Sequence, residues 1–201
     1  VMNLSDSMRT LLWLMSAAPT PFTVSLMSSS SLIGTAIAIA AGAMHSCVLN
    51  NDATASCWGY NGYGQIGNGN TTNQQSPVLV QGGHDWVDVD LGDYHTCGLR
   101  TDGTAMCWGY NGYGQLGDGT TSNRTSPVEV VGGKRMSQIT TGDIHSCGLD
   151  PAGRAYCWGY GGQGGLGNGG TGNSPAPVPV YGDYVFESID AGVRETVGIT
   201  R

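Results

Sequence analysis

Short segments of alternating apolar and polar residues recur along the chain and predict strands rather than helices. In the clearest of them, Trp86–Asp90, the indole ring and the two aspartates fall on one face, with Val87 and Val89 on the other. A period of two is typical of a half-buried β-strand. Stretches rich in glycine separate these segments, so the pattern predicts many short strands joined by tight turns.

The segments belong to a repeat of 50 residues, which appears when the sequence is shifted against itself. Three consecutive copies align without an insertion, which is the pattern of a repeat architecture. The coinciding positions include His45, His95 and His145; the cysteines; Trp58, Trp108 and Trp158; and Pro77, Pro127 and Pro177.

Each copy is interpreted as four strands. In the first copy these are Met44–Leu49, Thr54–Gly59, Val78–Val80 after Pro77, and Trp86–Asp90. Four strands repeated every 40 to 50 residues predict an all-β fold, a β-propeller of four-stranded blades. A solenoid of stacked hairpins is the alternative.

The repeat divides the chain into an N-terminal segment, 1–19, and a propeller region, 20–201. The propeller region is expected to begin with a partial blade at 20–42, with strands at Pro21–Val24 and Ala36–Gly42. Three full repeats follow, at 43–92, 93–142 and 143–192. The last segment, 193–201, is expected to be a closing or swapped strand. These make about 3–4 blades, and a partial ring leaves strand edges unpaired. We therefore expect two chains to complete one ring or the chain to belong to a longer one; closure with four blades is the alternative. The segment 1–19 suggests a helix or a signal-like remnant.

The cysteines form three equally spaced pairs: Cys47/Cys57, Cys97/Cys107 and Cys147/Cys157. If the first hairpin turns at Asp52, Cys47 and Cys57 lie opposite each other, at the ~4.5 Å between Cα atoms of a non-hydrogen-bonded pair, within the range of a disulfide. An even number of regularly spaced cysteines predicts disulfides, an oxidising compartment and an extracellular or cell-surface location. Six buried free thiols are the alternative.

The formal net charge of −7, with only 8 Lys and Arg, argues against a nucleic-acid partner, because binding phosphates requires clustered positive charge. The longest apolar run, Leu32–Met44, is interrupted by Gly and Thr and is shorter than the roughly 20 residues that cross a bilayer. No membrane span is therefore expected.

The segments Gly42–Cys47 and Cys57–Gly67 carry a recognisable motif. They resemble the regulator of chromosome condensation repeat, whose pattern is a Gly-x-x-His strand followed by Trp-Gly-x-Asn-x-x-Gly-Gln-Leu-Gly. Trp108–Gly117 matches this pattern throughout, whereas the third copy has Gly161 for Asn and Gly165 for Gln, so its loop is expected to lack the contacts of its equivalents. The resemblance covers about residues 20–201.

This resemblance implies a propeller, commonly of seven blades, and the paired cysteines look like those of a secreted, bacterial-type branch. The functions in the family are diverse: nucleotide exchange on a small GTPase, chromatin binding, and inhibition of a secreted β-lactamase. None of these transfers to the chain on the fold alone.

Motifs for catalysis or cofactors are weak. Gly62, Gly64 and Gly67 have the spacing of a dinucleotide fingerprint, but no helix is predicted after them, and the fingerprint needs one. His45 with Cys47 could contribute to a zinc site, but a hairpin disulfide and a packed histidine explain the spacing more simply. Without an evident acid–base pair, we expect no enzyme, cofactor or metal.

The loops after the second predicted strand are rich in Tyr, Asn, Gln and Gly, the composition of a binding surface on a rigid frame. The residues expected to contact a partner are Tyr60, Asn61, Tyr63, Tyr110, Asn111, Tyr113 and Tyr160, with Gln65 and Gln115 beside them. Tyrosines packed between blades are the alternative. Asp88, Asp90 and Asp93 add negative charge that would favour a basic partner. The leading hypothesis is a secreted module that binds protein; the alternatives are a lectin-like propeller that binds glycans and a self-associating structural subunit.

Overall fold

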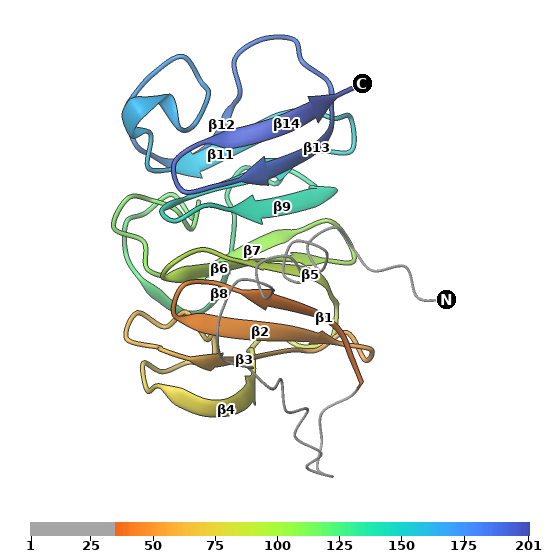
Figure 1. Cartoon of the computed structure of the whole chain (residues 1–201), viewed down its shortest axis with the longest axis vertical. Coiled ribbons are helices and arrows are strands. Elements are labelled where there is room, and N and C mark those ends of the chain that lie inside the picture. Colours follow the sequence, from red (N-terminus) through yellow and green to blue (C-terminus); the bar gives the residue numbers. More distant parts are fainter. Residues whose placement is uncertain (1–34) are drawn as a thin grey trace, which may run out of the picture. The chain divides into compact units, whose positions relative to one another are not determined.

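A computed structural model describes residues 35–201, which form three four-stranded antiparallel sheets and a fourth sheet of two strands (Figure 1). The strands of the first sheet are β1 (Ala36–Ala41), β2 (His45–Asn50), β3 (Ala55–Gly59) and β4 (Gln74–Leu79). The second contains β5 (Trp86–Leu91), β6 (His95–Arg100), β7 (Ala105–Gly109) and β8 (Arg124–Glu129). The third contains β9 (Gln138–Thr141), β10 (His145–Leu149), β11 (Ala155–Gly159) and β12 (Ser174–Pro179), with a 3-10 turn, η2 (Gly162–Gly164), between β11 and β12. The last contains β13 (Phe186–Ala191) and β14 (Thr196–Thr200).

In each complete sheet the strands lie in chain order, and the first strands of neighbouring sheets contact each other. β5 contacts both β1 and β9, and β9 contacts β13, whereas β4, β8 and β12 are the outer strands. Three complete blades and one two-stranded blade confirm the predicted all-β architecture of four-stranded units. The segment 1–19 and the strand predicted at Pro21–Val24 lie outside the described residues.

The prediction that Trp86–Asp90 is the last strand of the sheet that holds Cys47 is wrong. That segment is β5, which pairs with β6 rather than with β4. Only residues 92–94 connect β5 to β6, so the two strands form a hairpin. Each blade therefore takes its first strand from the end of the preceding 50-residue repeat. The strand predicted after Pro77 begins earlier, at Gln74, and Pro77 is tolerated inside it because β4 is the outermost strand of its sheet.

The predicted hairpins and disulfides are confirmed. Cys47 pairs with Cys57 in the register of β2 and β3, with their Cα atoms 4.1 Å apart, and a disulfide joins them. The pairs in the other two blades are bonded in the same way. The turn is stabilised by Asp52, whose Oδ1 accepts hydrogen bonds from the backbone and the hydroxyl of Thr54. These disulfides use the thiols that the zinc alternative would have needed.

A tryptophan from the next blade completes the core of each of the first two blades. Trp108, on β7, is fully buried in the cluster that contains Ile66 and Val80 of the first blade. Its Nε1–H donates to the backbone oxygen of Gln65 at 2.9 Å. Trp158 repeats this contact in the second blade, where it packs with Leu116. Neighbouring blades are thus joined by a buried apolar contact and by a directed hydrogen bond.

Buried histidines form a second joint between blades. Nε2 of His95 lies 2.9 Å from Oγ of Ser146 in the next blade, and that hydroxyl donates to the backbone oxygen of Gln115. The hydroxyl therefore accepts from Nε2–H, so the neutral form of His95 is the Nε2–H tautomer. Burial lowers the pKa of His95 to about 3, with a smaller contribution from the neighbouring histidines. His45 makes the same contact with Thr96, and burial lowers its pKa to about 4.

Close packing of the backbone near the first strands requires glycine. A Cβ on Gly92 would lie 2.5 Å from the backbone oxygen of Gly142 in the next blade. Along residues 35–201, no helix has the length and apolar character needed to cross a membrane.

Candidate functional site

The loops that follow the third strands are anchored to the turns between the first and second strands. The backbone N–H of Tyr110 donates to the oxygen of Tyr94 at 2.8 Å, where Tyr94 lies in the turn between β5 and β6. Tyr60 makes the equivalent bond with Met44, and Tyr160 with Ile144. Each blade thus brings one loop and one turn to the same end.

Six half-buried tyrosines form a continuous series at this end, which we call the tyrosine row. Its members are Tyr60, Tyr63, Tyr94, Tyr110, Tyr113 and Tyr160. Within the first two blades, the ring of Tyr63 lies 5.5 Å from that of Tyr94 and 5.0 Å from that of Tyr110, measured between centroids. Tyr113 continues the series to Tyr160 at 5.3 Å. All five tyrosines predicted from the sequence are therefore brought together.

Tyr94 was missed by the sequence analysis. Its equivalents in the other copies are Met44, Ile144 and Arg194, so the repeat gives no signal at this position. The structure identifies it as part of the row by the contact between its ring and that of Tyr63 and by the hydrogen bond between its turn and the loop of Tyr110.

Glycines allow the tyrosine rings to fold back over their own loops. A Cβ on Gly112 would collide with the hydroxyl oxygen of Tyr110, and the same is true of Gly62 under Tyr60. Each of these rings is therefore packed on one side against the backbone and is partly open on the other. Rings held in this way lose little conformational entropy when a partner binds.

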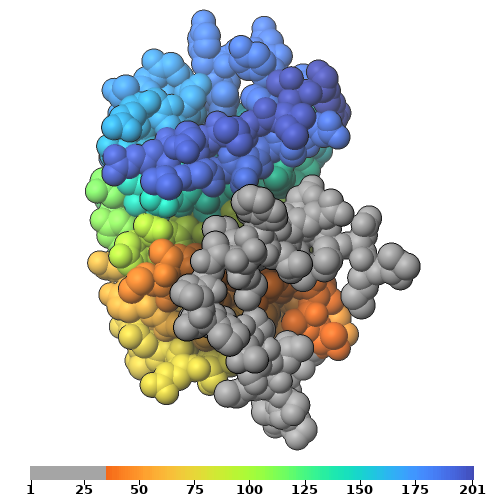
Figure 2. All heavy atoms as spheres, in the orientation of Figure 1, coloured from red at the N-terminus to blue at the C-terminus, as the bar shows by residue number. Residues whose placement is uncertain are grey.

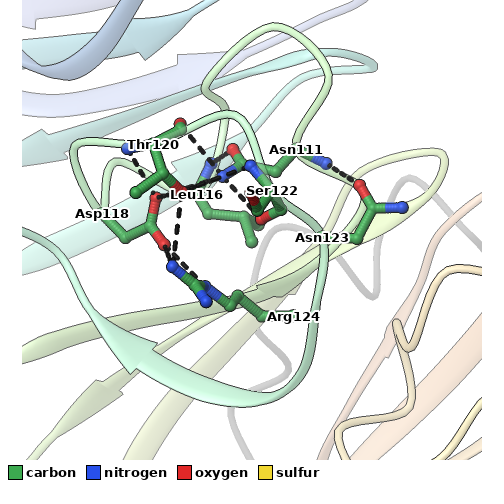
Figure 3. Close-up of polar contacts among 7 residues, drawn as sticks. All are labelled: Asn111, Leu116, Asp118, Thr120, Ser122, Asn123 and Arg124. Atoms are coloured by element: carbon green, nitrogen blue, oxygen red, sulfur yellow. Dashed lines mark hydrogen bonds and ion pairs between the residues drawn. The ribbon is translucent and has the colours of Figure 1, made fainter.

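The prediction that Asn61 and Asn111 contact a partner is not supported, because both side chains are fully buried. Figure 3 shows Asn111 at the centre of its loop. Its Nδ2 donates to the backbone oxygens of Thr120 and Ser122 at 3.1 and 3.0 Å, and its Oδ1 accepts from the N–H of Leu116 at 3.0 Å. Asn61 makes equivalent bonds in the first blade. These asparagines hold the loops in shape.

Gln65 and Gln115 are also fully buried, and each hydrogen-bonds to the backbone of a tyrosine in the row. Oε1 of Gln65 accepts from the N–H of Tyr63 at 3.1 Å, and Gln115 does the same for Tyr113 at 3.0 Å. The polar residues of these loops thus position the tyrosines and offer a partner little of their own.

The third loop lacks these supports, as its sequence predicts. Gly161 and Gly165 replace the asparagine and the glutamine, and Gln163 adopts a positive φ of 61°. Tyr160 keeps its place in the row, and the guanidinium of Arg194 lies 6.0 Å from its ring centroid.

The carboxylates predicted to attract a basic partner have different roles. Asp90 makes a hydrogen bond inside the protein: its Oδ2 accepts from the N–H of Thr141 at 2.7 Å. Burial raises the pKa of Asp88, with a further contribution from Asp90. Asp93, next to Tyr94, is half-exposed, and it faces Asp143, whose pKa is raised by partial burial and by the charge of Asp93. Negative charge near the row therefore comes from Asp93 and Asp143.

Two family models match this chain, and both describe the regulator of chromosome condensation (RCC1) repeat. One matches residues 36–65 and 86–115, and the other matches residues 57–99, 102–149 and 152–199. Together they cover most of the described chain.

Solved structures share the fold. Prp20p from Saccharomyces cerevisiae superposes with a TM-score of 0.75 at 20% identity, over 83% of this chain and 44% of Prp20p. The ectodomain of the receptor kinase CR4 from Physcomitrella patens gives 0.57 at 23% identity, over 83% and 39%. The CRINKLY ectodomain of ACR4 from Arabidopsis thaliana gives 0.56 at 22%, over 83% and 49%. The chain thus spans less than half the length of these structures, and the likeness confirms the propeller architecture.

Proposed function

The chain belongs to the regulator of chromosome condensation repeat family, and from this premise we propose that it is an extracellular module that binds a protein partner through the tyrosine row. The observation that carries the proposal is the row itself, in which half-buried rings are held at fixed spacings across three blades. Tyrosine, with tryptophan and arginine, is enriched among the residues that contribute most of the binding energy at protein interfaces.

A protein partner is favoured over a glycan by the polar groups beside the rings. A sugar site combines an aromatic platform with accessible hydrogen-bonding groups. Asn61, Asn111, Gln65 and Gln115 are instead fully buried, and their side-chain oxygens accept hydrogen bonds within their own loops. The remaining surface is amphipathic tyrosine with negative charge from Asp93 and Asp143. This combination suits a protein surface that carries Lys or Arg.

Two further facts support the proposal. The yeast relative Prp20p binds the proteins Gsp1p and histones. Three disulfides indicate an oxidising compartment, which supports an extracellular location.

The test compares three forms of the chain as immobilised baits: wild type, Tyr63→Ala with Tyr113→Ala, and a control with Tyr181→Ala and Tyr184→Ala. The control tyrosines are 78% and 58% exposed and lie outside the row. The probe is the protein fraction secreted by the source organism, analysed by mass spectrometry, and any retained protein is then purified and titrated.

We expect the wild type and the control to retain the same protein, and the double variant in the row to bind it at least ~10-fold more weakly. Circular dichroism should show that all three forms are folded. Equal affinity of the three forms would refute the proposal. A glycan array that shows sugar binding lost with the row variant would replace it with the lectin-like alternative.

A further inference from the structure

The surface of the tyrosine row offers a partner aromatic rings and phenol hydroxyls rather than backbone groups. Four backbone N–H groups of the row already donate within their own blades, namely those of Tyr60, Tyr63, Tyr110 and Tyr113. A strand that adds to a protein surface needs free backbone groups to pair with. These loops therefore do not suit a partner that binds as an added β-strand.

The rings of the row meet at steep angles and do not form a flat platform. The ring planes of Tyr63 and Tyr94 cross at 81°, and those of Tyr110 and Tyr113 cross at 78°. A flat platform suits a ring stacked on its face, whereas crossed rings contact a ligand from more than one side. Surfaces lined by aromatic rings are the sites where proline-rich segments dock in the polyproline II conformation.

A polyproline II segment also matches the hydrogen-bonding groups of the row. Proline has no N–H, so such a segment needs few acceptors from its partner. Its carbonyl oxygens make no hydrogen bonds within the segment, and the phenol hydroxyls of the row can donate to them. The segment is already extended before it binds, so it loses little conformational entropy.

The row repeats at a spacing that a polyproline II helix can follow. Figures 1 and 2 show the loops that carry the row one after another along the left edge of the molecule, in yellow-orange, green and blue. The steps from Tyr63 to Tyr110 and from Tyr110 to Tyr113 are 5.0 and 6.2 Å, so equivalent rings of neighbouring blades are separated by at most these two steps. One turn of polyproline II contains three residues and rises about 9 Å, which lies within that reach. Each blade can therefore contact one turn.

The charges at the row indicate where a basic residue of the segment would lie. Asp93, next to Tyr94, and Asp143 both line a hollow between the inner turns of the blades. Partial burial and the charge of Asp93 raise the pKa of Asp143, against a smaller opposing effect of Arg194. A cation between the two carboxylates would relieve their repulsion. Arg194 lies beside Tyr160, so the basic residue belongs at the opposite end of the row, beside Tyr94.

We infer that the tyrosine row binds a proline-rich segment of its protein partner in the polyproline II conformation, with a Lys or Arg of that segment between Asp93 and Asp143. This inference rests on the function proposed above and specifies the class of partner. The segment makes two turns, and its prolines pack against the rings of the first two blades.

The test is fluorescence anisotropy with fluorescein-labelled peptides. The probes contain three repeats of Pro-Pro-Ala with an arginine at the N-terminus in one and at the C-terminus in the other, because a polyproline II segment can lie in either direction. The matched controls contain three repeats of Gly-Ser-Ala with the same arginines. At least one proline peptide should bind saturably, and its Gly-Ser-Ala control should bind at least ~10-fold more weakly. No saturable binding of either proline peptide, or equal binding of probe and control, would overturn the inference.

Variants of the chain locate the binding. Tyr63→Ala with Tyr113→Ala should weaken the proline peptide at least ~10-fold, whereas Tyr181→Ala with Tyr184→Ala should leave it unchanged. Equal binding by these two variants would contradict a site on the row.

The position of the cation is tested separately. At low ionic strength, Asp93→Asn should weaken the arginine peptide at least ~3-fold and leave a proline peptide without arginine unchanged. The matched control is Asp183→Asn, an exposed carboxylate outside the row, which should bind both peptides like the wild type. An arginine peptide that is unaffected by Asp93→Asn would overturn the placement of the basic residue.

Competition separates this inference from the proposed function. The secreted protein retained by the immobilised chain is challenged with unlabelled arginine peptide at a concentration that saturates the row. If the protein depends on Tyr63 and Tyr113 but is not displaced, the row binds protein without a proline-rich segment, and only this inference fails. Saturable binding of the peptide without any retained protein would instead support the polyproline II site and contradict the secreted partner.

Discussion

The histidine joints predict that acid begins to weaken the fold as the pH falls below 6.5, the ordinary pKa of histidine. His95 is fully buried, Nε2 is bonded to Ser146, and Nδ1 has no hydrogen-bond partner among the described residues. A proton on Nδ1 would therefore place a buried charge beside nothing that could stabilise it. This is the physical reason for the lowering of the pKa of His95 to about 3.

The folded-state pKa of His95 is lower than its unfolded-state value of 6.5, so between pH 3 and 6.5 the unfolded chain binds more protons. The stability contributed by the neutral histidine is complete above pH 6.5 and is lost as the pH falls towards 3. Each pH unit in this window is worth about 1.4 kcal/mol, so His95 should cost the fold about 2 kcal/mol between pH 7 and pH 5.

Other groups titrate in the same range, so the effect is isolated with variants. Burial raises the pKa of Asp88 and Asp90, and their protonation stabilises the fold as the pH falls. Replacing His95→Gln keeps an amide donor but removes the site of protonation. Urea unfolding at pH 7 and pH 5 should show a pH dependence about 2 kcal/mol smaller for His95→Gln than for the wild type. The exposed His84→Gln is the matched control and should behave like the wild type, whereas an unchanged pH dependence in His95→Gln would refute the reasoning.

Two further effects on stability are expected. Asn111→Ala leaves two carbonyls and the N–H of Leu116 without their partner, so urea unfolding should show a loss of about 3 kcal/mol, while alanine at the exposed Asn70 should cost less than about 1 kcal/mol. Cys97→Ser with Cys107→Ser opens a loop of ten residues, which should lower the free energy of unfolding by about 3 kcal/mol; dithiothreitol should then destabilise the variant less than the wild type.

The hairpins and disulfides were predictable from the sequence because they depend on local rules. A turn at Asp52 fixes which residues oppose each other in β2 and β3, and the cysteines mark one opposed pair directly. The strand at which a blade begins could not be predicted in this way, because the spacing of a 50-residue repeat is the same whichever strand is counted first. The interval of three residues between Leu91 and His95 was the available signal, since it is too short for anything but a hairpin between β5 and β6.

The candidate site was predictable in its location but not in the role of its polar residues. Asn111 and Gln115 have the composition of an exposed binding loop, and a sequence does not show that a loop folds around its own amide groups. The third copy held a clue to this role, because it replaces both residues with glycine while it keeps Tyr160. Asparagine and glutamine that only hold a loop together are dispensable when the loop loses its internal hydrogen bonds. Tyr160 is retained although its loop has changed, which supports a role for its ring at the surface rather than in the loop.

The spacing of the tyrosine row depends on contacts between blades, and Gln65 shows how. Its side-chain oxygen accepts from the N–H of Tyr63, while its backbone oxygen accepts from Nε1 of Trp108 and from the hydroxyl of Thr96 in the next blade. The residue that positions a ring of the first blade is thus itself positioned by the second. Gln115 is held in the same way by Trp158 and Ser146. A single repeat would carry the same tyrosines but would lack the contacts that set their spacing, so the row is a property of adjacent blades.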